Sequence, residues 1–266
     1  MTYVRHRTRC LVYFRRFRLP RKASLPLLDK KKSQNRFLDR LPPATRTRVL
    51  ESCAQVSLKF AEVLTLPGER LEQVYFPQGS FISQIAPIDR RGIEVAMVGD
   101  EGMYGVHVGM GVSESPFKAV VQGAGPALCL PVAEFREHLA ASPELREQLA
   151  RYTYVVYGQV IQSAGCNRFH VVEQRLARWL LMTSDRAHSL CFEVTQVFLA
   201  HMLGVRRVGV TKAASELQAR GLIRYVRGHV QIMDLKTLRQ TACSCYRTDI
   251  ARYDNVFRKA GAAAEA

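Results

Sequence analysis

The hydrophobic positions along the chain change period twice. Between residues 63 and 130, short apolar runs alternate with turn residues such as Pro67-Gly68 and Arg91-Gly92, which is typical of antiparallel strands. The expected strands are 63–66, 74–76, 81–85, 93–98, 119–122 and 127–130. Many short strands at near-regular spacing predict a sandwich or jelly roll. Before them, a pattern through Leu50, Val56 and Leu58 predicts a short helix.

After Pro131 the apolar period becomes helical, and one seam of side chains recurs at alternating spacings of four and three. Its members are Leu145, Leu149, Tyr152, Val156, Gln159, Ser163 and Cys166. Such a heptad seam can pair with the same helix of a second chain, or it can lie on the β domain. Because a DNA-binding pattern follows, we favour pairing and expect a dimerisation helix over residues 143–166.

Residues 193–221 have the spacing of a helix-turn-helix. The first helix buries Leu199, Met202 and Leu203, and Gly204 supplies the tight turn. The second helix has one apolar face, made of Val210, Ala213, Ala214 and Leu217. The periodicity therefore predicts two short helices that pack together and leave the far side of the second one open.

That open side carries polar side chains, namely Arg206, Arg207, Thr211 and Lys212. A helix fits the major groove of DNA, and an arginine can donate two hydrogen bonds to guanine O6 and N7. Thr195 and Gln196, at the start of the first helix, join this predicted DNA-binding set. Thr195 either caps its own helix or contacts a phosphate oxygen, and both roles are compatible.

Two alternating strands follow the second helix, and Arg227-Gly228 between them is the signal of a tight hairpin. This hairpin is the wing of a winged helix. Arg224, Arg227 and His229 near its tip are candidates for phosphate contacts, with solvated hairpin charges as the alternative.

The distribution of charge points to a polyanionic partner. The 266-residue chain has a net charge of +16, from 39 Lys and Arg against 23 Asp and Glu. Residues 1–40 hold 13 basic and 2 acidic side chains, residues 41–166 hold 10 and 13, and residues 167–266 hold 16 and 8. A basic terminal domain is expected of a protein that neutralises phosphates. We expect residues 1–40 to be a disordered basic arm, and a solvated tail or an over-extended start is favoured over a DNA contact.

Several other classes of protein are disfavoured. No stretch approaches the roughly 18 uninterrupted apolar residues of a membrane span, and seven scattered cysteines do not suit a disulfide framework. We therefore expect a cytoplasmic protein with free thiols. No constellation of nucleophile and base or of paired carboxylates indicates an enzyme. Cys243 and Cys245 are too closely spaced for an ordinary zinc knuckle, so structural thiols without a metal are the favoured interpretation.

Four strings carry a resemblance to a known family. They are Glu173-Gln-Arg-Leu-Ala-Arg-Trp-Leu-Leu181, Leu199-Ala-His-Met-Leu-Gly-Val-Arg-Arg207, Gly221-Leu-Ile-Arg-Tyr-Val-Arg-Gly228 and Cys243-Ser-Cys-Tyr246. Together they resemble the Crp/Fnr superfamily of transcription regulators over about residues 41–246. The resemblance implies an α+β fold with a cyclic-nucleotide-binding-like β-roll, a long dimerisation helix and a C-terminal winged helix-turn-helix. We accordingly expect a basic arm at 1–40, a sensor domain at 41–142, the dimerisation helix at 143–166, a DNA-binding domain at 167–240 and a tail at 241–266.

The resemblance also implies how DNA is read. By position in the motif, Arg207, Val208 and Lys212 fall where family members contact bases, with Arg206 in the first turn. Val208 departs from the acidic residue often found there, so the preferred half-site is expected to differ from the best-known one. A homodimer on palindromic double-stranded DNA is implied, RNA polymerase is a further candidate partner, and no membrane is expected. A nonspecific nucleoid-packing protein is the alternative, but it would not explain the winged helix or the acidic middle.

Family members that bind cyclic AMP carry a Gly-Glu pair and, a little further on, an Arg-Ser-Ala-like run. The candidate effector pocket of this chain comprises Gly99, Glu101, Gly102, Lys118 and Ala119. Lys118 is the cation of this set, and it lacks the bidentate fork of an arginine. We therefore expect a sensor domain of unknown ligand and no cofactor, with cyclic-nucleotide binding as the disfavoured alternative. Cys10 and Cys53 stand alone, which disfavours an iron–sulfur cluster.

Overall fold

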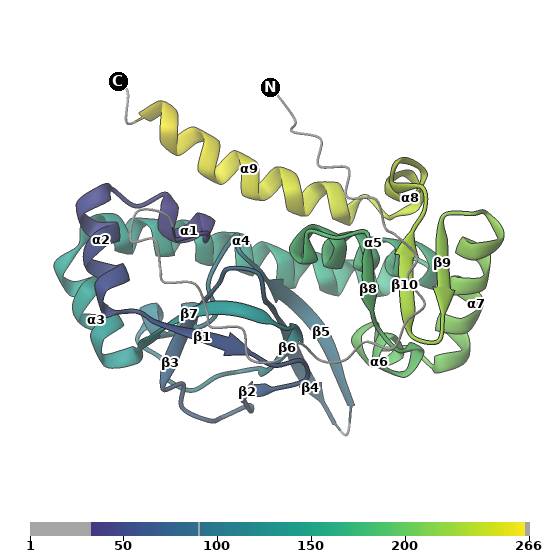
Figure 1. Cartoon of the computed structure of the whole chain (residues 1–266), viewed down its shortest axis with the longest axis horizontal. Coiled ribbons are helices and arrows are strands. Elements are labelled where there is room, and N and C mark those ends of the chain that lie inside the picture. The colour runs from purple at the N-terminus through teal and green to yellow at the C-terminus, as the bar shows by residue number, and fades with distance from the viewer. Residues whose placement is uncertain (1–32, 90, 264–266) are drawn as a thin grey trace, which may run out of the picture.

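The computed structural model describes residues 33–89 and 91–263 and confirms the predicted α+β fold (Figure 1). Two antiparallel sheets form the β-roll, and a third, small sheet belongs to the wing. The first sheet has the order β1 (Ala54–Leu58), β7 (Gly125–Pro131), β3 (Gln73–Pro77). The second has the order β2 (Val63–Thr65), β6 (Lys118–Gly123), β4 (Phe81–Ile88), β5 (Arg91–Val98). Helices α2 (Pro43–Ser52) and α3 (Val132–Ala141) and the 3-10 helix η1 (Val106–Met110) complete this half.

All six expected strands are present, but one strand was missed. Val56 and Leu58, expected on a helix, lie on β1, because α2 ends at Ser52 and the chain becomes extended from Ala54. Val56 pairs with Ala127 of β7, so strand pairing outweighs the helical spacing of the apolar residues.

The folded part of the chain begins earlier than predicted. Residues 1–32 of the expected arm lie outside the described residues, but α1 (Arg36–Asp39) packs into the β-roll. The Asn35 side chain caps α1 by accepting from the backbone N–H groups of Phe37 and Leu38, and both of these residues are buried. Its amide nitrogen also donates to the Pro77 carbonyl oxygen at 2.8 Å. The arm prediction is therefore wrong for residues 33–40. It rested on the basic composition of residues 1–40 as a whole, which gives no sign of the helix cap at Asn35 or of the core residues Phe37 and Leu38.

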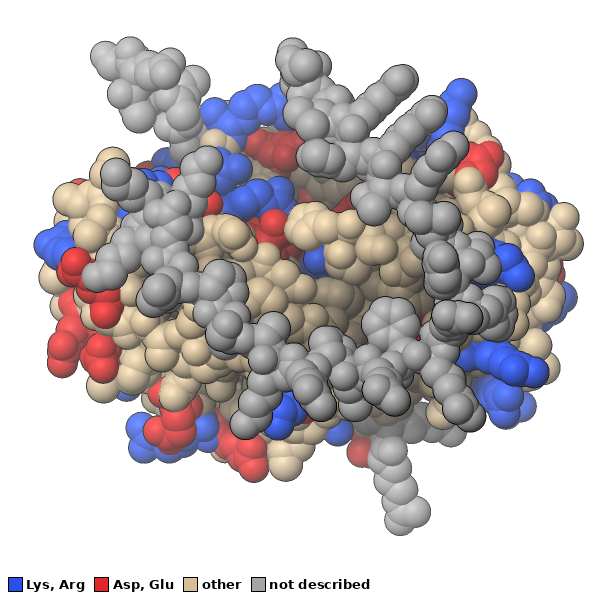
Figure 2. Space-filling view, in the orientation of Figure 1, with Lys and Arg blue, Asp and Glu red and all other residues tan. Residues whose placement is uncertain are grey.

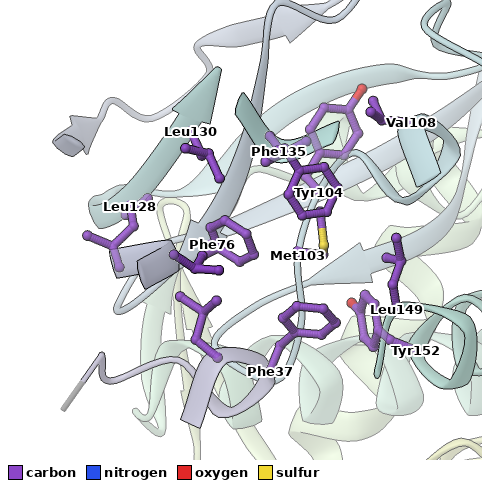
Figure 3. Packing of buried hydrophobic residues seen from close by; sticks show 14 of the residues in the cluster. Phe37, Phe76, Met103, Tyr104, Val108, Leu128, Leu130, Phe135, Leu149 and Tyr152 are labelled. Carbon is purple, nitrogen blue, oxygen red and sulfur yellow. The ribbon is translucent and has the colours of Figure 1, made fainter. Parts of the chain in front are cut away.

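Aromatic side chains fill the core between the sheets and the long helix (Figure 3). The ring centroids of Phe37 and Phe76 lie 5.9 Å apart, and those of Phe37 and Tyr152 lie 5.7 Å apart. Edge-to-face and offset ring contacts of this kind add to the free energy of apolar burial. Tyr152 comes from α4 (Pro143–Phe169), so the long helix is part of the β-roll core.

The heptad seam of α4 is buried within its own chain. Tyr152 and Leu149 belong to the β-roll core, and the Ser163 hydroxyl donates to the Val95 carbonyl oxygen at 2.9 Å. The preference for pairing this seam with a second chain is therefore wrong, and the alternative, in which the seam lies on the β domain, is correct. The exposed face of α4 is also apolar, and it carries Tyr154, Tyr157 and Ile161.

The expected C-terminal tail is in fact a helix, α9 (Cys245–Ala263), which runs along α4 (Figure 1). Tyr253 and Phe257 of α9 are buried and join the core of the β-roll. The Tyr253 hydroxyl donates to the Glu101 carbonyl oxygen at 3.0 Å. The last helix therefore closes back onto the first half of the chain, a long-range contact that local sequence does not indicate.

The winged helix-turn-helix has the predicted elements. They are α5 (Val172–Ala187), β8 (Cys191–Glu193), α6 (Gln196–Met202), α7 (Arg207–Ala219), β9 (Ile223–Val226), β10 (His229–Ile232) and α8 (Leu235–Thr241). Its core is continuous with buried side chains of the β-roll, among them Phe81, Ile85 and Met97. The two halves of the chain thus share hydrophobic packing. No helix in the described ranges is long and apolar enough to cross a bilayer.

A buried ion pair joins the two halves at the loop after β5. Arg186 of α5 donates to the Glu101 carboxylate at 2.6 Å and to the Met97 carbonyl oxygen at 3.0 Å. The Gly99 N–H donates to the other carboxylate oxygen of Glu101 at 3.1 Å. Both charged side chains are about 10% exposed or less. Each charge therefore depends on the other, because an unpaired charge in this position would lack solvation.

We expect Glu101→Gln to lower the free energy of unfolding by about 3–5 kcal/mol, because it leaves the Arg186 guanidinium buried without its counter-ion. Urea unfolding of the full chain measures this change. Glu147→Gln is the matched control, since Glu147 pairs with Arg151 on the surface of α4 and should change the free energy by less than about 1 kcal/mol. Equal effects of the two substitutions would contradict a structural role for the buried pair.

Candidate nucleic-acid interface

Helix α7 presents its predicted polar face to solvent. Arg206, at the N-cap position, and the helical residues Arg207, Val208, Thr211 and Lys212 are all exposed. On the opposite face, the side chains that hold α7 in place are buried, namely Val210, Ala213, Ala214 and Leu217. The sequence periodicity therefore identified both the packing face and the free face of this helix.

The N-terminus of α7 differs from those of α6 and α8, the neighbouring helices along the chain. Thr195 caps α6 and Asp234 caps α8, whereas α7 has no side-chain cap and no acidic residue in its first turn. Arg206 and Arg207 stand there instead, at the positive end of the helix dipole, where a cation is unfavourable. Free backbone N–H groups beside two guanidinium groups form a good site for an anion such as a phosphate.

A hollow of about 360 Å³ brings together α6, the start of α7 and the wing. It is lined by Thr195, Gln196, Val197, Arg207, Tyr225, Arg227 and Gly228. Four of the predicted DNA-binding residues thus share one concave surface. Val197 and Tyr225 were missed by the sequence reasoning. Val197 is an apolar residue exposed at a helix start, which can be recognised only once the burial of α6 is known.

One side-chain hydrogen bond links α6 to α7, and another caps α6. The Thr211 hydroxyl donates to the Gln196 side-chain oxygen at 2.7 Å, which leaves the Gln196 amide N–H₂ available to donate outward. The Thr195 hydroxyl oxygen accepts from the Phe198 N–H at 3.2 Å, so the capping role of Thr195 is present. Its phosphate contact stays a prediction, since the hydroxyl hydrogen remains available for donation.

The wing turns as the sequence predicted. Val226 pairs with His229, and the two residues between them, Arg227 and Gly228, have φ values of 49° and 84°. Positive φ at both central positions is the geometry of a type I′ turn. Arg227 is a residue that rarely adopts this conformation, so its side chain is held at the tip at some conformational cost.

The other two wing candidates differ in their surroundings. Arg224 is exposed on β9, opposite Gln231 of β10. The His229 ring nitrogen lies 3.5 Å from the Glu193 carboxylate, so a negative charge stands beside the position expected to approach a phosphate. Of the two, Arg224 is the better placed for a phosphate contact.

Figure 2 shows Lys and Arg side chains at the end of the molecule where Figure 1 places α7 and the wing, with acidic and basic side chains mixed at the opposite end. This separation follows the charge distribution of the sequence, in which residues 41–166 are mildly acidic and residues 167–266 are basic. A polyanion is therefore attracted to the winged-helix end.

The acidic member of the predicted effector pocket has another role. Glu101 is engaged by Arg186 and by the N–H of Gly99, as described above. A hollow of about 650 Å³ lies beside it, between α5, α9 and the loop after β5, and Asp100 and Arg186 also line it. This hollow lies between the two halves of the chain rather than inside the β-roll.

The other pocket candidates pack against neighbouring residues. A Cβ atom added to Gly102 would lie less than 2 Å from the Tyr152 side chain, so that ring occupies the space beside the glycine. Ala119 is fully buried in the β-roll core, and Lys118 is half-buried on β6. An effector pocket built from these five residues remains a prediction.

Comparison with known proteins identifies relatives of the C-terminal domain and of the overall fold. A profile of the Crp-like helix-turn-helix domain matches residues 174–241. FixK2 from Bradyrhizobium japonicum has the same fold, with a TM-score of 0.62, 13% sequence identity, and coverage of 72% of this chain and 98% of its own. The c-di-GMP-responsive global regulator CLP from Xanthomonas campestris has a TM-score of 0.61 at 16% identity, covering 73% of this chain and 100% of its own.

A transcriptional regulator of the CRP/FNR family from Thermus thermophilus has a TM-score of 0.59 at 23% identity, and the match covers 71% of this chain and 98% of its own. No curated protein sequence matches the chain. The Crp/Fnr resemblance stated from sequence is confirmed by the domain profile and the fold.

The substitution Arg227→Asn should remove the positive charge at the tip of the wing while keeping the turn conformation. Asn tolerates positive φ, so the wing keeps its turn and the free energy of unfolding stays equal or rises by up to about 1 kcal/mol. The lost cation should weaken binding to any duplex and reduce the slope of log affinity against log salt by about 1. Arg227→Lys is the control that keeps the charge. An unchanged salt slope in the Asn variant would show that Arg227 does not face DNA.

Proposed function

We propose that this protein, whose C-terminal domain is a Crp-like helix-turn-helix and whose fold is that of the Crp/Fnr regulators, binds DNA sequence-specifically as a homodimer. The observation that carries the proposal is the exposed, cationic and uncapped start of α7 beside a hollow that the wing completes. Because these features gather on one end of the chain, a single duplex can contact all of them.

In this proposal, residues of α7 contact the DNA bases. Arg207 and Lys212 can donate to base edges in the major groove, and the exposed Val208 offers an apolar contact to a thymine methyl group. Arg206, Arg224 and Arg227 surround this helix and are assigned to phosphates, which position the protein without reading sequence. Gln196, held by Thr211, can reach either a base edge or a phosphate through its amide N–H₂.

The dimer contact is assigned to the exposed seam of α4. At spacings of four and three residues, that face presents Ala150, Tyr154, Tyr157, Ile161 and Ala164, all exposed in the single chain. Two such helices related by a two-fold axis bury these side chains against each other. The two α7 helices then enter successive major grooves, with half-sites about 34 Å apart.

The β-roll is the sensor in this proposal, and its ligand is not a cyclic nucleotide held by an arginine. Lys118 stands in for that arginine, and Glu101 is already paired with Arg186. The protein acts in the cytoplasm, where reduced thiols persist, and RNA polymerase is its further partner at promoters. Binding rather than catalysis is the proposed activity.

In vitro selection of random duplexes with the purified chain tests sequence reading. We expect an inverted repeat with half-sites about one helical turn apart, enriched without added nucleotide. On the selected duplex, Arg207→Ala should cost about 1–3 kcal/mol and relax one position of each half-site, whereas Arg224→Ala should weaken binding to all duplexes equally. If the protein binds duplexes but enriches no sequence, it packs DNA nonspecifically and the proposal fails.

Tyr157→Asp tests the dimer contact. Because Tyr157 is exposed in the single chain, the substitution should leave the fold intact but place two carboxylates at the two-fold axis. We expect the dimer dissociation constant, measured by analytical ultracentrifugation, to rise at least about tenfold. Ile88→Asp, an exposed apolar residue at the end of β4, is the control. A Tyr157→Asp protein that remains as dimeric as the control would place the contact elsewhere.

A further inference from the structure

Four potential metal ligands meet where α4 ends. Cys166 lies in the last turn of α4, His170 follows that helix directly, and Cys243 and Cys245 lie at the junction of α8 and α9. One ligand atom from each residue lies within 4.8 Å of each of the others. The three cysteines are buried and the histidine is half-buried. None of these four residues belongs to the proposed DNA-binding set.

Two distances inside the cluster are close to those around a single tetrahedral ion, and all pairs of ligand atoms lie within 4.8 Å. The sulfur atoms of Cys166 and Cys243 lie 3.5 Å apart, and the Cys245 sulfur lies 3.6 Å from His170 Nδ1. With Zn–S bonds of about 2.3 Å and Zn–N bonds of about 2.0–2.1 Å, a tetrahedral site separates two sulfurs by about 3.8 Å and a sulfur from a nitrogen by about 3.6 Å. We propose that Cys166, His170, Cys243 and Cys245 bind one structural zinc ion.

The chemistry of the donors favours zinc over other groups. Three thiolates and one imidazole make a closed four-ligand site, which is typical of structural zinc rather than of a catalytic metal with an open position. In an iron–sulfur cluster the cysteines bind several different irons, so their sulfur atoms must lie further apart than they do here. A disulfide between Cys166 and Cys243 would need an S–S distance of about 2.05 Å and would leave Cys245 and His170 without a role.

Polar side chains of α4 and α5 surround the cluster. The Gln162 amide donates to the Cys245 sulfur at 3.1 Å, the kind of outer contact that orients a metal ligand. Arg178 of α5 lines a small hollow together with Cys166. Arg178 is buried and also pairs with Asp249 of α9 at 2.7 Å. A buried cation beside the cluster compensates the net negative charge of three thiolates around Zn²⁺.

The proposal departs from the sequence interpretation of Cys243 and Cys245 as structural thiols without a metal. The pair lacked further ligands in sequence, and the structure supplies them from 77 and 75 residues away. The Cys166-x₃-His170 spacing, four residues apart at a helix end, was the signal that could have revealed them.

The position of the ion suggests what it does. His170 lies in the joint between α4 and α5, so a metal would tie the joint that leads into the winged helix to the start of α9. Arg175 of α5 reinforces the same joint by donating to the Asn167 side chain at 2.5 Å and to the Leu203 carbonyl oxygen. Zinc would therefore fix the direction in which the winged helix leaves the long helix.

Metal analysis of the full-length protein, purified under reducing conditions, tests this inference. We expect one zinc per chain by mass spectrometry, and after exchange with Co²⁺ we expect tetrahedral d–d bands in the visible and a thiolate charge-transfer band in the near ultraviolet. Cys243→Ser and His170→Gln should weaken zinc affinity more than about 100-fold, since loss of an outer partner alone costs 10–100-fold. Cys53→Ser and His201→Gln, which lie outside the cluster, should each retain one zinc per chain.

The wild-type chain provides a readout that does not depend on how the variants fold. A chelator should remove the zinc and lower the unfolding temperature, and added ZnCl₂ should restore both the stoichiometry and the temperature. If the reduced wild-type chain takes up neither Zn²⁺ nor Co²⁺, or if Cys243→Ser and His170→Gln bind zinc as tightly as the wild type, the inference is wrong. Zinc stoichiometry is measured without DNA, so this result and that of the duplex selection can fail independently.

Discussion

The arrangement of the whole chain depends on burying two opposite charges at one place. Glu101 comes from the loop after β5 and Arg186 from the last turn of α5, so their contact sets where the winged helix lies against the β-roll. Around the same loop, Asp100 accepts from Arg36 at 3.4 Å and lies 3.1 Å from His188, and Tyr253 of α9 donates to the Glu101 backbone. A short loop thus holds α1, α5 and α9 together.

Because the winged helix shares a hydrophobic cluster with strands of the β-roll, its free surface is well defined. The apolar face of α7 is used against α5, α6 and β9, and what remains exposed is a cluster of cations. Two local rules are broken there, since arginines stand at the positive end of α7 and Arg227 adopts a positive φ. Local conflicts of this kind are expected at functional sites, where the missing stabilisation comes from a partner. A phosphate backbone supplies the anion that both features lack.

The sequence correctly predicted the elements that depend on the local pattern of hydrophobic, polar and turn residues. The six strands, the helix-turn-helix and the Arg227-Gly228 turn are set by alternation, helical spacing and turn residues, and all were located correctly. The errors have a common cause, which is contact between residues far apart in the chain. A heptad seam looks the same whether a second chain or its own β-roll covers it, so Tyr152 gave no hint of its contact with Phe37. Likewise, the local sequence around Phe257 of α9 does not show that this residue packs in the core of the β-roll.

The central claim is that two copies of α7 read DNA in a two-fold arrangement. Hydroxyl-radical footprinting of the full-length protein on a tightly bound duplex tests it most directly, because it maps the protected sugars on each strand. The account predicts protections related by two-fold symmetry and centred about one helical turn apart on one face of the duplex. A single unpaired protection, or continuous protection without symmetry, would contradict it.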